Sequence, residues 1–566
     1  MFKKIAHLIL IFTALTCFAD EPAKLTPLQQ LAKMSGKATA TVIYQGVNVF
    51  TGNKSPVLSN MAIIVDGDRI KSIIPMAELD HAKYAAAEIV DMPGVFVMPG
   101  LIDSHGHVRG LGTALDTVDL RGIQSEKEIA DKVRAAARQA KPGEWILGRA
   151  WDQNLWAAKN FPTADSVTAA APDNPVALTR VDGHAVWVNR KALELADINA
   201  ATKDPQGGRV MRDASGKPTG VFLDNAMGLV NRRIPEPNPE QIEQRLLHAL
   251  QECARLGMTT VHDAGVEQAD IDGYKSLIRK GLMPIRVYAM VRGPSGPTLD
   301  AWLAKGPEIG DYLTVRSIKL VSDGALGSRG AAVLEPYSDD PGNRGLAILD
   351  RAVIRGVAEK AVPRGFQVNT HAIGDAANRA AIDAYGDVLK GPNDHRFRVE
   401  HAQVVAPEDF AKFKQFSVIA SMQATHATSD MPWAQQRLGP ERIKGAYAWR
   451  TFMKLGVHVP NGSDFPVESP NPLWGLYAAI TRQDKDGKPA GGWFPNQRMT
   501  REEALRSWTA EGAYAAFEEN KKGSLEVGKM ADFIMLSGDV MTMPEIDIWK
   551  THVKMTVVGG KIVHQE

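Results

Sequence analysis

The stretch Pro99-Gly100-Leu101-Ile102-Asp103-Ser104-His105-Gly106-His107 decides the fold of this chain. It follows a short apolar run at 95–98, which predicts a buried strand. Residues two positions apart on an extended backbone point to the same side, so the imidazoles of His105 and His107 can converge on one metal ion. Taken alone, the motif fits a polar loop with two unrelated histidines equally well.

The composition is that of a globular protein with a large core. The chain has 566 residues, of which 44% are apolar and 23% are charged, and its net charge is +1. Because the sequence contains no strongly basic block, we expect neither nucleic acid nor an anionic membrane surface as a partner. The length allows several ordinary domains or one α/β barrel with additions.

The first 19 residues resemble a secretory signal. Lys3 and Lys4 supply the positive start, an apolar stretch follows at 5–18, and Ala19 ends a small-residue cleavage site. About 14 mostly apolar residues are too few to span a bilayer, which takes roughly 20. We therefore predict a signal peptide at 1–19, export to a bacterial periplasm, and no stable membrane anchor after cleavage.

Cysteine is too scarce to build either a disulfide or a thiolate metal site. The chain has two cysteines, and removal of the signal would leave Cys253 without a partner. Cys253 lies on a predicted helix that starts at Asn238-Pro239 and stops at Leu256-Gly257, at a position typical of a core residue. Metal ligands in an exported protein of this composition must be histidines and carboxylates.

Both ends of the chain are rich in short β-like runs separated by turn signals. We predict one flanking β-sandwich built from both termini, with its first part in 20–94, after a polar tail, and its second part in 516–566. The region between them, 95–515, alternates strands with helices, which is typical of a parallel α/β fold.

Nine strand candidates occur in this middle region, one more than a (β/α)8 TIM-type barrel needs. We assign the run at 176–179 to an inserted subdomain, about 126–234, because that segment is too long for one βα unit after barrel strand one. The nine candidates are 95–98, 176–179, 259–262, 285–290, 315–321, 366–370, 397–399, 418–422 and 457–460.

Four polar residues lie on, or just after, the later barrel strands: Lys319 on strand four, His371 on strand five, His401 on strand six and Asp464 after strand eight. Each alone has an ordinary explanation, such as a hydrogen-bonded core histidine, a snorkelling lysine or an aspartate in a turn. Active sites of such barrels assemble at the carboxyl ends of the strands, however. Together with the two histidines of strand one, these positions predict a metal site.

These motifs resemble the amidohydrolase superfamily, metal-dependent hydrolases on a (β/α)8 barrel with a flanking β-sandwich. The similarity covers nearly everything after residue 40 and is greatest for the branch called amidohydrolase family 3, which includes N-substituted formamide deformylase. Besides the opening stretch, it rests on Asp182-Gly183-His184-Ala185, the segment 319–330, Thr370-His371-Ala372-Ile373-Gly374-Asp375, Val399-Glu400-His401, Gly462-Ser463-Asp464 and the segment 528–532.

The resemblance implies two divalent metal ions, for which zinc suits the nitrogen and oxygen donors. His105 and His107 would bind the more buried ion, and His371 and His401 the more exposed one. Lys319 would bridge them once its amine is carboxylated, because a free ammonium cannot ligate a cation. Asp464 would complete the buried site and face a bridging hydroxide.

The implied reaction is cleavage of a carbon–nitrogen bond in a small-molecule, non-peptide amide of N-formyl or N-acyl type. Hydroxide would attack the carbonyl, and Asp464 would pass the proton to the leaving amine.

The resemblance to the family is also the sole basis for expecting a homodimer. The ester, lactone or phosphotriester hydrolases of the same fold remain alternatives.

Two further alternatives are disfavoured by particular residues. Mononuclear deaminases of this superfamily lack the strand-four lysine and carry a glutamate shortly after the strand-five histidine, whereas here Lys319 is present and Ala372-Ile373-Gly374-Asp375 follows His371. A barrel without enzymatic activity would be expected to have lost ligands, and all six are present.

Selectivity is predicted to come from residues around the barrel mouth. His184 is the candidate for contacting the substrate carbonyl, and Arg329 for receiving a substrate carboxylate. An aromatic-walled pocket would suit a fairly apolar substrate, although the tryptophans of the insert fit the core of that subdomain as well. The remaining candidates for this wall are Trp151, Trp156 and Trp187 in the insert, and His426 and Trp433 after strand seven.

Overall fold

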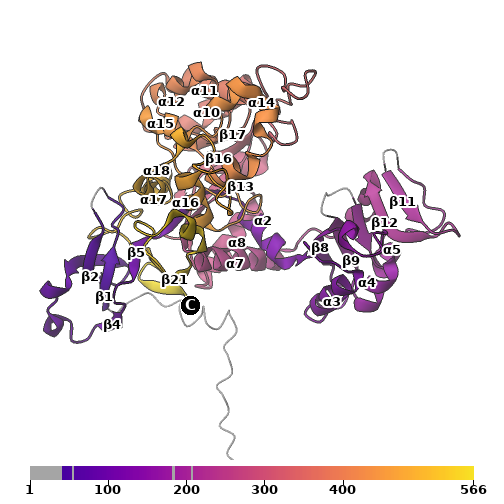
Figure 1. Cartoon of the computed structure of the whole chain (residues 1–566), viewed down its shortest axis with the longest axis horizontal. Helices are drawn as coiled ribbons and strands as arrows, with labels where there is room; N and C mark the ends of the chain where they lie inside the picture. The colour runs from indigo at the N-terminus through magenta and orange to yellow at the C-terminus, as the bar shows by residue number, and fades with distance from the viewer. Residues whose placement is uncertain (1–40, 54–55, 181–184, 206–207) are drawn as a thin grey trace, which may run out of the picture.

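The computed structural model describes residues 41–53, 56–180, 185–205 and 208–566 (Figure 1). The predicted signal peptide, the tail that follows it and His184 lie outside the described residues. Within the described ranges, no helix is both long enough and apolar enough to cross a membrane.

The centre of the molecule is the predicted parallel α/β barrel. Its strands lie in the order β19-β18-β17-β16-β14-β13-β6, and every neighbouring pair along this path is parallel. A short β15 (Glu308–Ile309), outside this path, pairs antiparallel with β16. The strands are β6 (Leu101–Gly106), β13 (Met258–Val266), β14 (Arg286–Arg292), β16 (Leu313–Val321), β17 (Gln367–Ala372), β18 (Arg398–His401) and β19 (Ile419–Ser421).

The segment 458–464 occupies the eighth position and closes the barrel between β19 and β6. On one side, the amide of Met422 donates to the carbonyl of Pro460 over 3.0 Å. On the other side, the amide of Asp464 donates to the carbonyl of His105 over 2.7 Å. Among the described residues, this segment makes one isolated β-bridge, between Met422 and Asn461. Pro460 has no N–H to donate, so the expected strand at 457–460 makes barrel contacts without a regular ladder.

The assignment of barrel strand one to 95–98 is wrong. That run forms β5 (Phe96–Pro99), which belongs to the terminal sheet and pairs with β1 (Thr41–Val49) and β20 (Phe533–Leu536). The first barrel strand is β6, so His105 lies within the strand and not after it. The two strands are separated only by Gly100, where a Cβ would lie 2.2 Å from the side chain of Thr259.

The terminal sheet combines both ends of the chain, as predicted. It has eight strands in the order β22-β21-β20-β5-β1-β2-β3, with β4 pairing beside β1. Tyr44 and Phe533, from opposite ends of the sequence, pack edge to face in its core with ring centroids 5.0 Å apart. Its other strands are β2 (Leu58–Asp66), β3 (Arg69–Pro75), β4 (Glu88–Asp91), β21 (Val553–Val558) and β22 (Lys561–Gln565).

The insert after barrel strand one has its own six-stranded sheet, in the order β11-β12-β10-β9-β8-β7. In Figure 1 it lies to one side of the barrel, and the terminal sheet lies to the other. This sheet starts at Val118, before the predicted boundary at 126. Its elements are β7 (Val118–Asp119), α3 (Glu126–Ala137), β8 (Ile146–Trp151), α4 (Ala164–Ala170), β9 (Val176–Arg180), β10 (Ala185–Val188), α5 (Arg190–Leu195), β11 (Gly208–Arg212), β12 (Pro218–Asp224) and α6 (Gly228–Asn231).

Helices follow the barrel strands. The predicted helix containing Cys253 is α7, which begins with a capping box at Asn238 and a proline at its first position and buries Cys253 completely. The others are α2 (Val108–Asp116), α8 (Gln268–Arg279), α9 (Pro297–Lys305), α10 (Arg351–Ala361), α11 (Asp375–Leu389), α12 (Phe410–Gln415), α13 (Ala424–Asp430), α14 (Ala434–Arg442), α15 (Trp449–Lys454), α16 (Pro472–Thr481), α17 (Arg501–Ser507) and α18 (Ala510–Ala515), while α7 itself spans Pro239–Arg255.

Candidate metal centre

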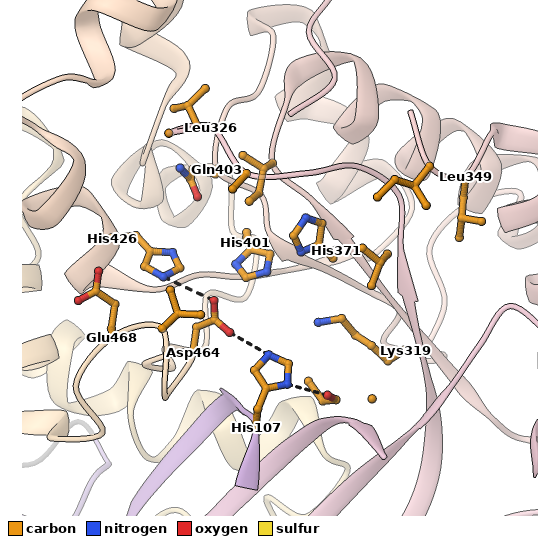
Figure 2. A pocket seen from close by; sticks show the side chains of 18 of the residues that line it. His107, Lys319, Leu326, Leu349, His371, His401, Gln403, His426, Asp464 and Glu468 are labelled. Carbon is orange, nitrogen blue, oxygen red and sulfur yellow. Dashed lines mark hydrogen bonds and ion pairs between the residues drawn. The ribbon is translucent and has the colours of Figure 1, made fainter. Parts of the chain in front are cut away.

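A cavity of about 650 Å³ opens at the carboxyl ends of the barrel strands. The structure brings all six predicted ligands to it, and Figure 2 shows Asp464 between the histidines. His105 lies beneath the cavity with none of its surface exposed. The other five line the cavity: His107, Lys319, His371, His401 and Asp464.

The two histidines of strand one are held by hydrogen-bond acceptors on their Nδ1 atoms. His105 Nδ1 lies 2.5 Å from Oε2 of Glu400, and His107 Nδ1 lies 2.8 Å from the carbonyl oxygen of Ala264. Because both partners only accept, each Nδ1 carries the proton and each Nε2 keeps its lone pair. Those Nε2 atoms lie 3.6 Å and 3.1 Å, respectively, from Oδ1 of Asp464.

The histidine of strand six is oriented in the same way. His401 Nδ1 lies 2.7 Å from Oε1 of Gln423, which leaves Nε2 to face the cavity. The ring of His371 packs against it, with centroids 4.5 Å apart. His371 Nε2 lies 3.3 Å from Oδ1 of Asp323 but makes no hydrogen bond in the described part of the chain. Asp323 also accepts the amide of Ile373, so it orders the turn after strand five.

Asp464 is held in place by a second, buried aspartate. Asp103 accepts hydrogen bonds from the Ser463 amide and hydroxyl, the latter over 2.6 Å. Asp464 has φ 59°, a backbone conformation that costs energy for a residue other than glycine and is common at functional sites. Burial would raise the pKa of Asp464, but the contact with the Nε2 atom of His107 and the other imidazoles around the carboxylate hold that pKa well below its usual value. Asp464 is therefore an anion.

Lys319 lies at the floor of the cavity without a carboxylate partner at hydrogen-bond distance among the described residues. Its Nζ is 2.9 Å from Nε2 of His105, and its side chain is buried in the barrel. Burial lowers the pKa of Lys319, against the opposing charges of Glu400 and Asp464. An uncharged amine is thereby favoured relative to an exposed lysine.

The donors fit divalent metal ions. Burial lowers the pKa of His105 and His401 well below the usual value, and neutral imidazole is the form that ligates. Two groups of side chains have their ligand atoms close enough to share an ion, with all atoms of a group within 4.8 Å of one another. One group is His105, His107 and Asp464, and the other is His401, His426 and Asp464. Imidazole nitrogen and carboxylate oxygen suit zinc among the common metals.

Three of the residues that organise this site were not identified from the sequence as partners of the histidines. Glu400, Gln423 and Asp323 are all buried and contact the predicted ligands His105, His401 and His371, respectively. A signal for the first existed, since Glu400 directly precedes His401. Asp323 lies within the segment 319–330 on which the resemblance rests, but nothing in that segment pairs it with His371. Gln423 lies 22 residues from His401, and no local pattern marks it.

The tryptophans predicted to contact the substrate lie inside the insert. Trp151 and Trp187 are completely buried, and their rings pack against each other with centroids 5.9 Å apart. Their indole N–H groups donate to backbone carbonyls, that of Trp151 to Leu178 and that of Trp187 to Thr163. Both are therefore core residues of the subdomain, because large aromatic rings dominate the packing of a small core. His184 lies outside the described residues.

The loop residues expected near the mouth fall into two groups. His426 and Trp433, after strand seven, line the cavity as expected. Arg329 instead forms a paired hydrogen bond with Asp339, with both distances 3.0 Å, and is not among the described residues that line the cavity.

Comparisons with known proteins agree with this geometry. A family model described as "Amidohydrolase family" matches residues 88–564. The chain is 34% identical to the Arabidopsis thaliana protein LONG AFTER FAR-RED 3, over 94% of this chain and 93% of that protein. It is 26% identical to the N-substituted formamide deformylase of Arthrobacter pascens, over 89% of this chain and 95% of that enzyme. The solved structure of an uncharacterized metal-dependent hydrolase from Pyrococcus furiosus has a TM-score of 0.74 and 27% identity, covering 89% of this chain and 100% of that one.

Proposed function

The chain belongs to the amidohydrolase family and is a hydrolase, and from this premise we propose that it cleaves a carbon–nitrogen bond in a non-peptide amide of N-formyl or N-acyl type. The observation that carries the proposal is the position of Asp464, whose carboxylate lies between two groups of histidines at the carboxyl ends of the barrel strands. The similarity to a formamide deformylase supports the amide bond as the target.

The proposed cofactors are two divalent metal ions, zinc by the chemistry of the donors. His105 and His107 would hold one ion, and His401 and His371 would contribute to the other. When bound, such ions supply Lewis acidity, which polarises a carbonyl group and lowers the pKa of water. Glu400, Ala264 and Gln423 orient the imidazoles, and this second layer of contacts keeps each Nε2 directed at the ions.

Asp464 is the proposed proton carrier. Its carboxylate is ionised, lines the cavity and is fixed by the loop that Asp103 holds. It would accept the proton of the attacking water at a carboxylate oxygen and deliver it to the nitrogen of the leaving amine. An amine needs that proton because its anion is a poor leaving group.

The cavity wall supports a substrate with an apolar substituent. Leu326, Leu349, Ile373 and Trp433 line it beside the metal ligands. A volume of about 650 Å³ lies in the range of small-molecule sites. Burial of an apolar group against these side chains would favour binding by about 25 cal/mol for each Å² removed from water.

A substrate panel on zinc-loaded protein tests the reaction. We expect hydrolysis of N-formyl or N-acyl amines with apolar substituents, with the free amine as product. Removal of the metal ions with a chelator should abolish at least about 99% of the rate, since the ions supply the Lewis acidity of the site. Matched esters, lactones, phosphotriesters and amino-substituted heterocycles form the comparison set. Hydrolysis of esters or lactones alone, or release of ammonia without amide cleavage, would overturn the proposed bond type.

We propose that Lys319 is carboxylated in the active enzyme. Its amine would add carbon dioxide and lose one proton, giving a carbamate anion. The position favours this change, because the amine lies among histidines at the cavity floor, where an ammonium would repel metal ions and a carbamate oxygen would bind them.

Reconstitution of metal-free protein tests the carbamate. With zinc in buffer stripped of carbon dioxide, we expect less than about a tenth of the activity recovered with added bicarbonate, since the anionic ligand cannot form. The Lys319→Met variant serves as the control, because it should not respond to bicarbonate at all. Equal recovery of the wild-type protein in both buffers would contradict carboxylation.

A further inference from the structure

His426 is a buried histidine to which the six-residue ligand set assigns no role. It lies on α13, four residues before the end of the helix, and is only 8% exposed while lining the cavity. Its Nε2 has no hydrogen-bond partner within the described ranges. A buried nitrogen without a partner costs free energy unless something else in the cavity satisfies it.

The neighbour of this nitrogen is the second oxygen of Asp464. His426 Nε2 lies 3.6 Å from Oδ2 of Asp464, whereas His107 and His105 face Oδ1 of the same carboxylate. Figure 2 shows the carboxylate between His107 and His426, one on each side. The carboxylate therefore presents a different oxygen to each of two histidine groups.

The separations suit shared ions better than hydrogen bonds. Two donors bound to one zinc ion at about 2.1 Å lie roughly 3.4 Å apart at the tetrahedral angle. The 3.6 Å between His426 Nε2 and Asp464 Oδ2 is close to that value and too long for a hydrogen bond. The same separation occurs between His105 and Oδ1, on the side where the more buried ion is proposed.

The segment that carries His426 also orients His401, the other histidine in its group with Asp464. His401 and His426 lie with their rings stacked, 21° from parallel and 5.8 Å between centroids. Gln423, at the N-terminus of α13, accepts from Nδ1 of His401 and so turns its Nε2 to the cavity. One short segment after strand seven therefore orients His401 and supplies His426.

We propose that His426 is a ligand of the more exposed metal ion, and that Asp464 joins the two ions with one carboxylate oxygen on each, each oxygen keeping a second lone pair at which the proton can be carried. The more exposed ion would then be held by His401, His426 and Oδ2 of Asp464, with His371 on the far side of His401. The inference rests on the proposed function, because it presupposes a two-metal hydrolase. It adds a ligand from the helix after strand seven to the set taken from strands one, four, five, six and eight.

The metal content of a His426 variant distinguishes a metal ligand from a residue that only contacts the substrate. After loading with zinc and desalting, we expect two zinc ions per wild-type chain and one in His426→Ala. A chelator competition should show the affinity for the second zinc reduced more than the roughly 10- to 100-fold that loss of an outer-shell contact causes. His248→Ala is the matched control, since His248 is a half-buried histidine on α7 that is paired with Asp116 over 2.9 Å, and this variant should retain both ions.

A crystal of zinc-loaded wild-type protein gives a second measurement that does not depend on the variant folding. We expect anomalous density with His426 Nε2 at about 2.0–2.1 Å from the outer ion. Two results would overturn the inference and point to a contact between His426 and the substrate. One is that His426→Ala keeps both ions and loses only turnover. The other is that Nε2 of His426 in the wild type lies more than about 3 Å from zinc, since a Zn–N bond is about 2.0–2.1 Å long. A single zinc per wild-type chain overturns it as well. Failure of the wild-type protein to bind zinc at all would instead refute the proposed function.

Discussion

The Asp464→Asn enzyme is expected to turn over its amide substrate roughly 10²- to 10⁴-fold more slowly than the wild type, the range attributed to a positioned acid–base group. Asparagine keeps the shape of the side chain and its place on the loop that Asp103 and Ser463 hold. It carries no negative charge, however, and its oxygen is a poor proton acceptor at neutral pH. The proton would no longer have a carrier between the attacking water and the leaving nitrogen.

Steady-state kinetics, combined with metal analysis of the same sample, measures this effect. The expected loss is in kcat, with metal content determined separately so that a weakened site is not mistaken for weakened proton transfer. Asp131→Asn is the matched control, because Asp131 is an exposed aspartate on α3 paired with Lys127 and lies in the insert. A kcat within tenfold of the wild type, at full metal content, would show that another group carries the proton.

The second large effect is on stability and concerns the contact between the barrel and the terminal sheet. Arg286, at the start of β14, forms two hydrogen bonds with Asp532, over 2.8 Å and 2.9 Å, and both side chains are at most 5% exposed. Arg286→Met is expected to lower the apparent free energy of unfolding by about 3–5 kcal/mol, because removal of one partner leaves the other charge buried. Urea unfolding followed by tryptophan fluorescence measures the change.

The pH dependence of the unfolding free energy tests whether the loss of the Arg286–Asp532 ion pair causes this destabilisation. Burial would raise the pKa of Asp532, but the charge and hydrogen bonds of Arg286 hold it below the usual value. Such a depressed pKa stabilises the fold above the pKa of the unfolded chain, and the contribution disappears as the pH falls through the folded-state pKa. The gap between wild type and Arg286→Met should therefore narrow in acid. The double variant Arg286→Met with Asp532→Leu should recover much of the loss, and no recovery would point to lost packing of the arginine instead.

Much of the barrel could be predicted because its strands are buried on both faces and so appear as continuous apolar runs. Six barrel strands lie at the expected runs, and Lys319, His371 and His401 lie on three of them. Strand one could not be placed correctly by the same pattern. The apolar runs on either side of Gly100 look alike in sequence, and only their partners, β20 for one and β13 for the other, assign them to different sheets.

The class of fold and the candidate ligands could be identified from the sequence, because strand periodicity and short motifs are local properties of the chain, and the family followed from the resemblance of those motifs. Only the tertiary structure decided which nitrogen of each histidine faces the cavity, since the partners Glu400 and Gln423 come from other strands or helices. It also placed Trp151 in the core of the insert and His426 beside Asp464. These outcomes depend on contacts between segments far apart in the chain, and no local pattern carries that information.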